Sequence, residues 1–168
     1  MGAARSRVDT NEVYDPAYVV LAYPGGDVPE GRGVCTDVVI RAYRALGVDL
    51  QQRVHEDMKR NFSAYPRLWG LRSTDRNIDH RRVPNLQTFF TRHGSKLPLR
   101  EGTSHYRPGD LVTWRLPGNL PHIGIVSDRR VPDGQRPLII HNIGAGSAEE
   151  DVLLAYPITG HYRYYPGR

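Results

Sequence analysis

The sequence contains a single cysteine, Cys35, which stands at the start of a predicted helix in the stretch GVCTDVVIRAYRALG (33–47). Unsatisfied N–H groups and the positive end of the helix dipole favour the thiolate there, which is the nucleophilic form of the side chain. A buried structural cysteine is the alternative, because free cysteines are among the most buried residues. The helix start predicts a thiol pKa below the value of about 8.5 for a free cysteine.

A cysteine nucleophile needs a base, and two of the seven histidines are candidates. His122 opens the run HIGIVSD, and His141 interrupts the apolar run PLIIHNI. If these runs pair as a hairpin, the two imidazoles lie near each other, although alternation alone does not fix the register. Asn142 is the other candidate for the third position, and it lies on the opposite face of the strand from His141. Each histidine alone is better explained by a hydrogen-bonded core position, and it is their combination with Cys35 that indicates catalysis.

Other chemistries fit the sequence less well. One cysteine excludes a paired-cysteine zinc site, and VHEDM (54–58) lacks the second histidine of a zincin helix, so no metal is expected. Asp75, Asp79 and His80 fit a polar loop network better than a cation site, because their spacing is irregular. The scattered basic residues lack the aromatic pattern of a nucleic-acid module, and we expect no nucleic-acid partner.

The order of the predicted elements indicates an α+β fold. Helical periodicity marks 35–46, 50–62 and 84–93, while residues 13–23 fit either a short helix or a strand. The period then changes to two, and the predicted strands are 110–116, 122–128, 137–143 and 161–165. Helices followed by an antiparallel sheet are typical of α+β proteins. We expect a flexible segment over 1–12 and a single domain over 13–168.

The charge and hydropathy of the chain limit its surroundings. The formal net charge of +5 favours polyanionic surroundings such as nucleic acid, anionic lipid or a cell-wall polymer, although many soluble domains carry a similar charge. No apolar run approaches the ~18–20 residues of a membrane span. The opening MGAARSRVDT is not followed by an apolar stretch, so no signal peptide is visible in this chain.

Several long blocks resemble one bacterial family, the one catalogued as domain of unknown function 1287. The blocks begin near Tyr23 and are YPGGDVPEGRGVCTDVVIRAYRALGVDLQQRVHEDM, NIDHRRVPNLQTFF, PGDLVTWRLPGNLPHIGIVSD, HNIGAGSAEEDVL and GHYRYY. That family in turn resembles the NlpC-type cell-wall cysteine peptidases. The resemblance implies a papain-like fold, in which N-terminal helices, one of them carrying the nucleophile, pack on a C-terminal antiparallel sheet.

The same resemblance implies roles for particular residues. Cys35 corresponds to the nucleophile, His122 to the general base and His141 to the group that orients the base. Tyr23, Thr36, Asp37 and Asn142 are expected near the substrate or the oxyanion. One departure stands out: NlpC-type peptidases usually read D-C-S-G at the nucleophile, whereas this chain has Val34 before Cys35. Val34 cannot hold a free peptide amine, so the departure leaves open which bond is cut.

The sequence therefore predicts a cysteine hydrolase of amide bonds in peptidoglycan peptides, acting as an endopeptidase or an amidase without a cofactor. The alternatives are a non-catalytic cell-wall-binding module and an acyltransferase that uses the same triad. A place outside the cytoplasm, in the periplasm or cell envelope, follows from the resemblance alone. We expect the protein to be a monomer.

Overall fold

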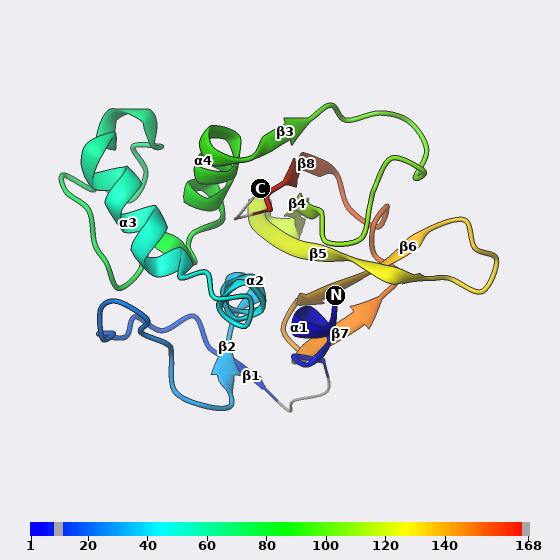
Figure 1. The fold of residues 1–168 in the computed structure, drawn as a ribbon, viewed down its shortest axis with the longest axis horizontal. Helices are drawn as coiled ribbons and strands as arrows, with labels where there is room; N and C mark the ends of the chain where they lie inside the picture. The colour runs from blue at the N-terminus through cyan, green and yellow to red at the C-terminus, as the bar shows by residue number, and fades with distance from the viewer. Residues whose placement is uncertain (9–11, 166–168) are drawn as a thin grey trace.

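The computed structural model describes residues 1–8 and 12–165, and a six-stranded antiparallel sheet runs through its centre (Figure 1). The spatial order of the strands is β3, β8, β4, β5, β6 and β7. Their bounds are β3 Ser95–Leu97, β4 Leu111–Leu116, β5 Leu120–Arg130, β6 Pro137–Asn142, β7 Ser147–Glu150 and β8 Ile158–Arg163. The four predicted strands are confirmed. The two edge strands, β3 and β7, are too short to show a period-two pattern.

Four α-helices complete the α+β fold, and a small parallel strand pair lies before the second one. The helices are α1 Gly2–Arg5, α2 Cys35–Arg44, α3 Leu50–Arg60 and α4 Val83–His93. The strand pair is β1 Val13–Tyr14 with β2 Arg32–Gly33, and the single turns of 3-10 helix are η1 Phe62–Ala64, η2 Asp79–Arg81 and η3 Pro117–Asn119. The run 13–23 thus contributes only the two residues of β1.

Local chemistry explains where the three long helices begin and end. The Asp49 carboxylate accepts a hydrogen bond from the Gln52 N–H at 3.2 Å and caps α3. Pro84 stands in the first turn of α4, where its missing N–H costs nothing, and Gly94 follows the last residue. In α2 the Asp37 carboxylate reaches back to accept the Val34 N–H at 2.8 Å.

Apolar side chains cover both faces of the sheet. On one face, Ile123, Ile125 and Ile140 pack against residues of α2 such as Val38 and Val39. On the other face, the cluster is built from strands and loops, with Val112, Trp114, Val126, Ile139, Tyr106 and Leu153. Alternation along the strands sends neighbouring residues to these two clusters. The helix that begins with Cys35 therefore lies directly on the sheet.

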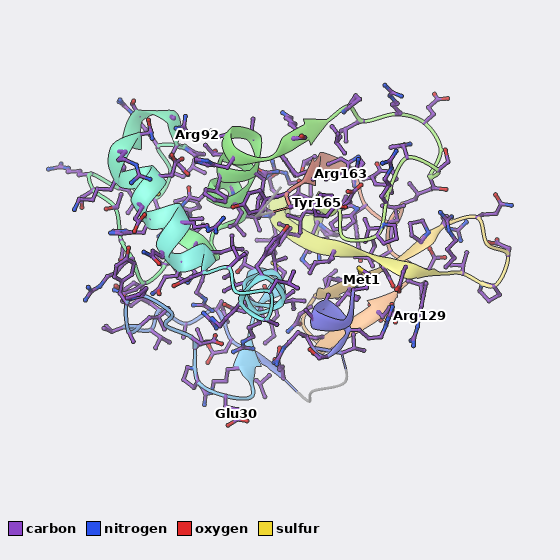
Figure 2. The ribbon with its side chains drawn as sticks, in the orientation of Figure 1. Met1, Glu30, Arg92, Arg129, Arg163 and Tyr165 are labelled. Atoms are coloured by element: carbon purple, nitrogen blue, oxygen red, sulfur yellow. The ribbon has the colours of Figure 1, made fainter. Side chains whose placement is uncertain are left out.

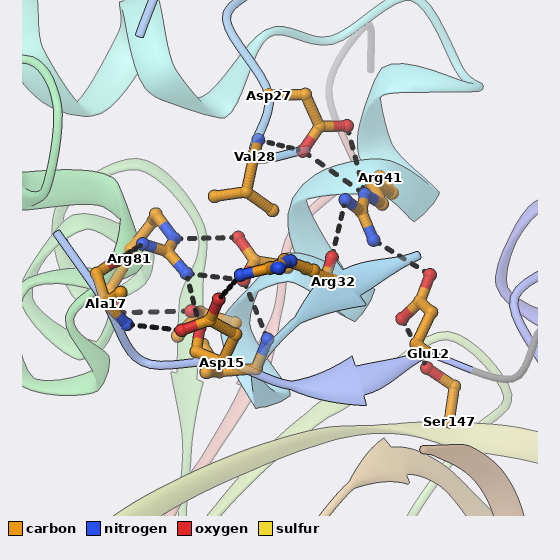
Figure 3. A network of polar contacts seen from close by, with 12 residues as sticks. Glu12, Asp15, Ala17, Asp27, Val28, Arg32, Arg41, Arg81 and Ser147 are labelled. Carbon is orange, nitrogen blue, oxygen red and sulfur yellow. Dashed lines mark hydrogen bonds and ion pairs between the residues drawn. The ribbon is translucent and has the colours of Figure 1, made fainter. Parts of the chain in front are cut away.

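The described part of the segment 1–12 packs against the domain. Ala4 is buried against α2, and Met1 adjoins the same cluster (Figure 2). The buried Glu12 accepts hydrogen bonds from Arg41 Nη1 at 2.8 Å and from Ser147 Oγ at 3.0 Å (Figure 3). Glu12 thus has the polar partners that a buried carboxylate requires. Residues before position 13 contribute to the packing of the domain, and the expected domain start at residue 13 leaves them out.

Antiparallel pairing of β5 with β6 confirms the predicted hairpin and gives its register. Ile125 lies opposite Ile140, so His122 and His141 point to the same face. Gly124 stands opposite His141 in this register and faces the same side. A Cβ atom at Gly124 would stand 2.6 Å from Ile139 Cγ2 and 3.1 Å from the His141 Cβ.

The substitution Gly124→Ala is expected to lower the free energy of unfolding by about 1–3 kcal/mol, because overpacking forces these strands apart. Urea unfolding followed by circular dichroism measures the change. Gly2→Ala is the matched control, since its Cβ meets open space and the change should stay within about 0.5 kcal/mol. A stable Gly124→Ala variant would show that the strands relax at no cost.

Candidate functional site

Cys35 is the first residue of α2 and is buried, with 5% of its surface exposed. The helix start packs against β5, and Cys35 lines a cavity of about 200 Å³. Tyr14, Trp69 and Arg82 form part of the cavity wall, together with Pro121, the residue before His122. The thiol therefore lies at the bottom of a pocket between the helix start, the polar loop 69–82 and the beginning of β5.

Burial dominates the electrostatics of the thiol. Loss of solvent raises the pKa of Cys35 to about 11, and the charge of Asp37 adds to this effect. The backbone amides of Ile123, Thr36 and Cys35 itself favour the thiolate but do not outweigh the burial. This direction is the opposite of the one predicted from the helix start. The thiol of the free protein is accordingly neutral at neutral pH.

His122 and His141 form a hydrogen-bonded pair on neighbouring strands. His122 Nε2 lies 2.9 Å from His141 Nδ1, and both side chains are buried. His141 Nε2 lies 3.0 Å from the carboxylate Oε2 of Glu150 on β7. If His141 Nε2–H donates to Glu150, then His141 Nδ1 accepts from His122 Nε2–H. This chain leaves His122 Nδ1 as the nitrogen with a free lone pair.

The charge state of the pair follows from its burial. Burial, with a smaller effect of His141, lowers the pKa of His122 to about 3. Burial also lowers the pKa of His141, although Glu150 acts in the opposite direction. Both rings are therefore neutral at neutral pH, the state in which an imidazole accepts a proton.

The residues before and after His122 lie close to Cys35 through their backbone. Pro121 lines the same cavity as Cys35, and the amide of Ile123 favours the thiolate. The His122 ring points toward His141, and in the part of the chain that the structure describes no hydrogen bond joins it to the thiol. Ile123 packs with Cys35 in the cluster on the α2 face of the sheet, whereas His122 pairs with Trp114 and lies beside its ring on the other face. The structure therefore does not bring the His122 ring and the thiol to the same face of the sheet.

Asn142 lies on the other face of β6, as alternation requires. Its Oδ1 accepts a hydrogen bond from the Gly144 N–H at 3.0 Å, which stabilises the turn after the strand. Of the two candidates for the third position, the structure brings His141 and not Asn142 to His122.

The structure brings Thr36 and Asp37 to Arg81 instead of leaving them open to a ligand. Both are buried, and the Thr36 hydroxyl donates to the Arg81 carbonyl at 3.1 Å. Asp37 accepts from Arg81 Nε and Nη2, each at 3.0 Å. Arg81 Nη1 also donates to the carbonyl of Ala17 at 3.2 Å (Figure 3). These residues position the helix start, and their polar groups are occupied.

Tyr23 lies in another part of the molecule. Its ring packs edge-on against His55, with 5.2 Å between the ring centroids, and Arg76 lies over it. Tyr14 is the tyrosine that lines the Cys35 cavity. The sequence pattern did not indicate a role for Tyr14, because the glycines after Tyr23 fit the family pattern better. Arg81 and Glu150 were missed as well, and only the polar content of 69–82 hinted at Arg81.

The loop 69–82 is a structured network, as its spacing suggested. Asp79 and His80 are buried, and the Asp75 N–H donates to the Asp79 carboxylate. The Asp79 carbonyl accepts from Asn85 Nδ2 at 3.0 Å.

Among residues 1–8 and 12–165, no helix combines the length and the apolar character needed to cross a membrane.

Comparisons with known proteins cover nearly the whole chain. The family model described as "Domain of unknown function (DUF1287)" matches residues 1–164. The chain is also 58% identical over 162 residues to a protein of Escherichia coli (strain K12) described as "Uncharacterized protein YijF". The alignment covers 96% of this chain and 78% of that relative.

Breaking the buried ion pair between Asp37 and Arg81 is expected to destabilise the protein strongly. Each side chain is only 2% exposed, so Arg81→Met or Asp37→Asn leaves its partner without a counter-charge or a matched donor. Each single substitution should lower the free energy of unfolding by about 3–5 kcal/mol, and the double variant by less than the sum. Urea unfolding of all three variants gives the coupling energy.

The exposed pair Arg60 and Glu56, 3.9 Å apart, is the matched control, and either of its single substitutions should cost less than about 1 kcal/mol. Additive effects of Asp37→Asn and Arg81→Met would contradict a coupled pair.

Alkylation of Cys35 in the free protein should be slow and should rise with pH. Because burial raises the thiol pKa to about 11, the thiolate fraction grows about tenfold per pH unit up to pH 9.5. Iodoacetamide labelling followed by mass spectrometry measures the rate, and the rate for the urea-unfolded chain should reach half its maximum near pH 8.5. A plateau in the folded protein below pH 8.5 would mean that the helix start, not burial, governs the thiol.

Proposed function

The chain belongs to the DUF1287 family, and we propose that it is a cysteine hydrolase of amide bonds in peptidoglycan peptides. In this proposal Cys35 is the nucleophile, His122 the general base and His141 the residue that orients the base. The proposed fold type is papain-like, with the nucleophile at the start of a helix that packs on an antiparallel sheet. The resemblance to NlpC-type peptidases supplies the substrate class.

The observation that carries the proposal is the hydrogen bond of 2.9 Å between His122 and His141. An imidazole held through Nε2 keeps one tautomer and one ring angle, and its Nδ1 is free to accept a proton. The strand that supplies His122 also supplies the amide beside the thiol, on Ile123. A nucleophile, a base and a group that orients the base are the three parts that such a site needs.

The reaction begins with both partners neutral. In the proposed reaction the proton of Cys35 moves to His122 Nδ1 as Sγ forms a bond to the substrate carbonyl carbon. This step requires the His122 ring to reach the α2 face of the sheet, whereas in the free protein it lies beside Trp114 on the other face. The resulting imidazolium gives that proton to the leaving amine when the C–N bond breaks. A water molecule, deprotonated by His122, then cleaves the thioester and restores the thiol. No metal or organic cofactor takes part in this sequence of steps.

The developing oxyanion requires hydrogen-bond donors close to Cys35. The backbone N–H groups at the start of α2 are the candidates, since the first N–H groups of a helix have no partner within it. Tyr14 takes the role that the sequence comparison gave to Tyr23, because Tyr14 lines the cavity. Thr36 and Asp37 act through Arg81 and not through substrate.

A non-catalytic wall-binding module is the second candidate function. The raised pKa of Cys35 and the lack of a hydrogen bond between its thiol and the His122 ring favour it. An acyltransferase would share every step up to the thioester and then use an amine in place of water.

As a hydrolase of wall peptides, the protein would act as a monomer in the periplasm or cell envelope.

Digestion of purified peptidoglycan tests the proposal. The wild type should release peptide fragments, whose masses separate an amidase from an endopeptidase, while Cys35→Ala and His122→Ala should release none. The double variant should be no worse than either single variant, because the two residues act as one unit. Binding without release by the wild type would favour the wall-binding module.

The third position is tested in the same assay. His141→Ala should lower kcat by about 10²-fold or more, because the base loses its orientation, and His141→Asn should recover part of the rate. Asn142→Ala is the matched control on the opposite face of β6 and should affect stability more than rate. If Asn142→Ala is the damaging change, the arrangement of the triad is wrong.

A further inference from the structure

Two features of the Cys35 cavity have no role in the proposed reaction. They are the ring of Trp69 and the guanidinium of Arg82, both of which form part of its wall. The Arg82 carbon Cζ lies 4.1 Å from the centroid of the Trp69 ring, a short cation–π contact. This contact restrains the guanidinium in the wall of the cavity that Cys35 also lines.

Arg82 has a long ion-pair contact with Asp79 and no hydrogen bond to it. Its Nη1 is buried and makes no hydrogen bond within the described residues, 1–8 and 12–165. The nearest carboxylate oxygen, Asp79 Oδ1, lies 3.9 Å from Nη1, beyond hydrogen-bond distance, and also has no hydrogen-bond partner there. A buried guanidinium N–H without an acceptor is costly and normally meets one.

The neighbouring Arg81 differs from Arg82 in the hydrogen bonds that its guanidinium makes. Arg81 also lines the wall, but its guanidinium bonds both oxygens of Asp37. Arg82 has no such paired hydrogen bonds, only the ion-pair contact of 3.9 Å with Asp79, so its guanidinium keeps donors for a ligand. Its side chain is 19% exposed, so it can be reached from solvent.

The backbone of Trp69 adopts an unusual conformation. Its φ is 58°, in the left-handed region that a bulky side chain rarely adopts, and half of its surface is exposed. A strained residue persists where the surroundings fix it, and such residues gather at ligand-binding sites. Here the Trp69 ring forms an aromatic wall that the Arg82 guanidinium contacts.

The shape of the cavity limits what it accepts. Its volume of about 200 Å³ is below the roughly 300–1,000 Å³ of sites for whole small molecules. Much of the remaining wall is apolar, with Val34, Ile78, Val83 and Pro84. The space suits one short segment of a peptide that carries an anionic group.

We propose that Arg82, supported by Trp69, binds a carboxylate of the substrate next to the amide bond that Cys35 attacks. This subsite rests on the proposed function, because it selects among peptides for the same thiol. A planar guanidinium and a planar carboxylate pair through two parallel hydrogen bonds, which gives orientation as well as affinity. The substrate class is then a peptide with a free carboxylate within a residue of the scissile bond.

Peptide binding to the Cys35→Ala protein tests the subsite without turnover. The probes are four versions of L-Ala-γ-D-Glu-L-Lys-D-Ala, with the α-carboxylate of D-Glu free or amidated and the C-terminal carboxylate free or amidated. Titration calorimetry should show that amidating one of the two carboxylates weakens binding by about 10- to 100-fold. Adding Arg82→Gln should remove that difference, and adding Arg82→Lys should keep part of it.

The exposed Arg72, in the same loop, provides the control, and Arg72→Gln should leave the preference unchanged. Equal binding of all four peptides, no binding of any, or a preference that survives Arg82→Gln would overturn the subsite. The proposed hydrolysis fails in a different way, if the wild type binds the carboxylate form tightly and does not cleave it. In the wild type with active turnover, Arg82→Gln should raise KM more than it lowers kcat.

Discussion

The buried ion pair between Asp37 and Arg81 holds together the segments that surround the Cys35 thiol. Asp37 belongs to the first turn of α2, Arg81 to the end of the loop 69–82, and Arg81 also reaches the carbonyl of Ala17, three residues after Tyr14 (Figure 3). Two charges this deeply buried are stable only as a pair. The position of the helix start, and with it the cavity, depends on this contact.

Burial is the second constraint, and it gives the site a neutral resting state. The same loss of solvent raises the pKa of the thiol and lowers that of His122, so neither carries a charge at neutral pH. A neutral pair works by moving the proton during the attack, in the manner of a serine and a histidine, and needs no preformed ion pair. The site then avoids the cost of two isolated charges in an apolar cavity.

Much of the fold could be predicted from the sequence, because its signals are local. Apolar spacing marked the three long helices and the four long strands, and Asp133-Gly134 marked the hairpin that brings His122 to His141. The edge strands β3 and β7 are too short for such signals. At the site, the hairpin brings the two predicted histidines together, but their rings lie on the other face of the sheet from the Cys35 thiol.

Other parts of the site depend on long-range packing that no local pattern carries. The pairing of Asp37 with Arg81 spans 44 residues, and the contact between His141 and Glu150 depends on the edge strand β7. The pKa of Cys35 follows how completely the sheet covers the helix start, which the sequence does not give. The same holds for Tyr14, which reaches the cavity through the short pair of β1 and β2.

The central claim is that His122 activates Cys35, and covalent trapping tests it most directly. The protein is mixed with a p-nitrophenyl ester of N-acetyl-L-alanine, quenched in acid within seconds and analysed by intact and peptide mass spectrometry. We expect one acetylalanyl group on Cys35 in the wild type and a large loss of that adduct in His122→Ala. Equal acylation of the two proteins, or an adduct on another residue, would contradict it.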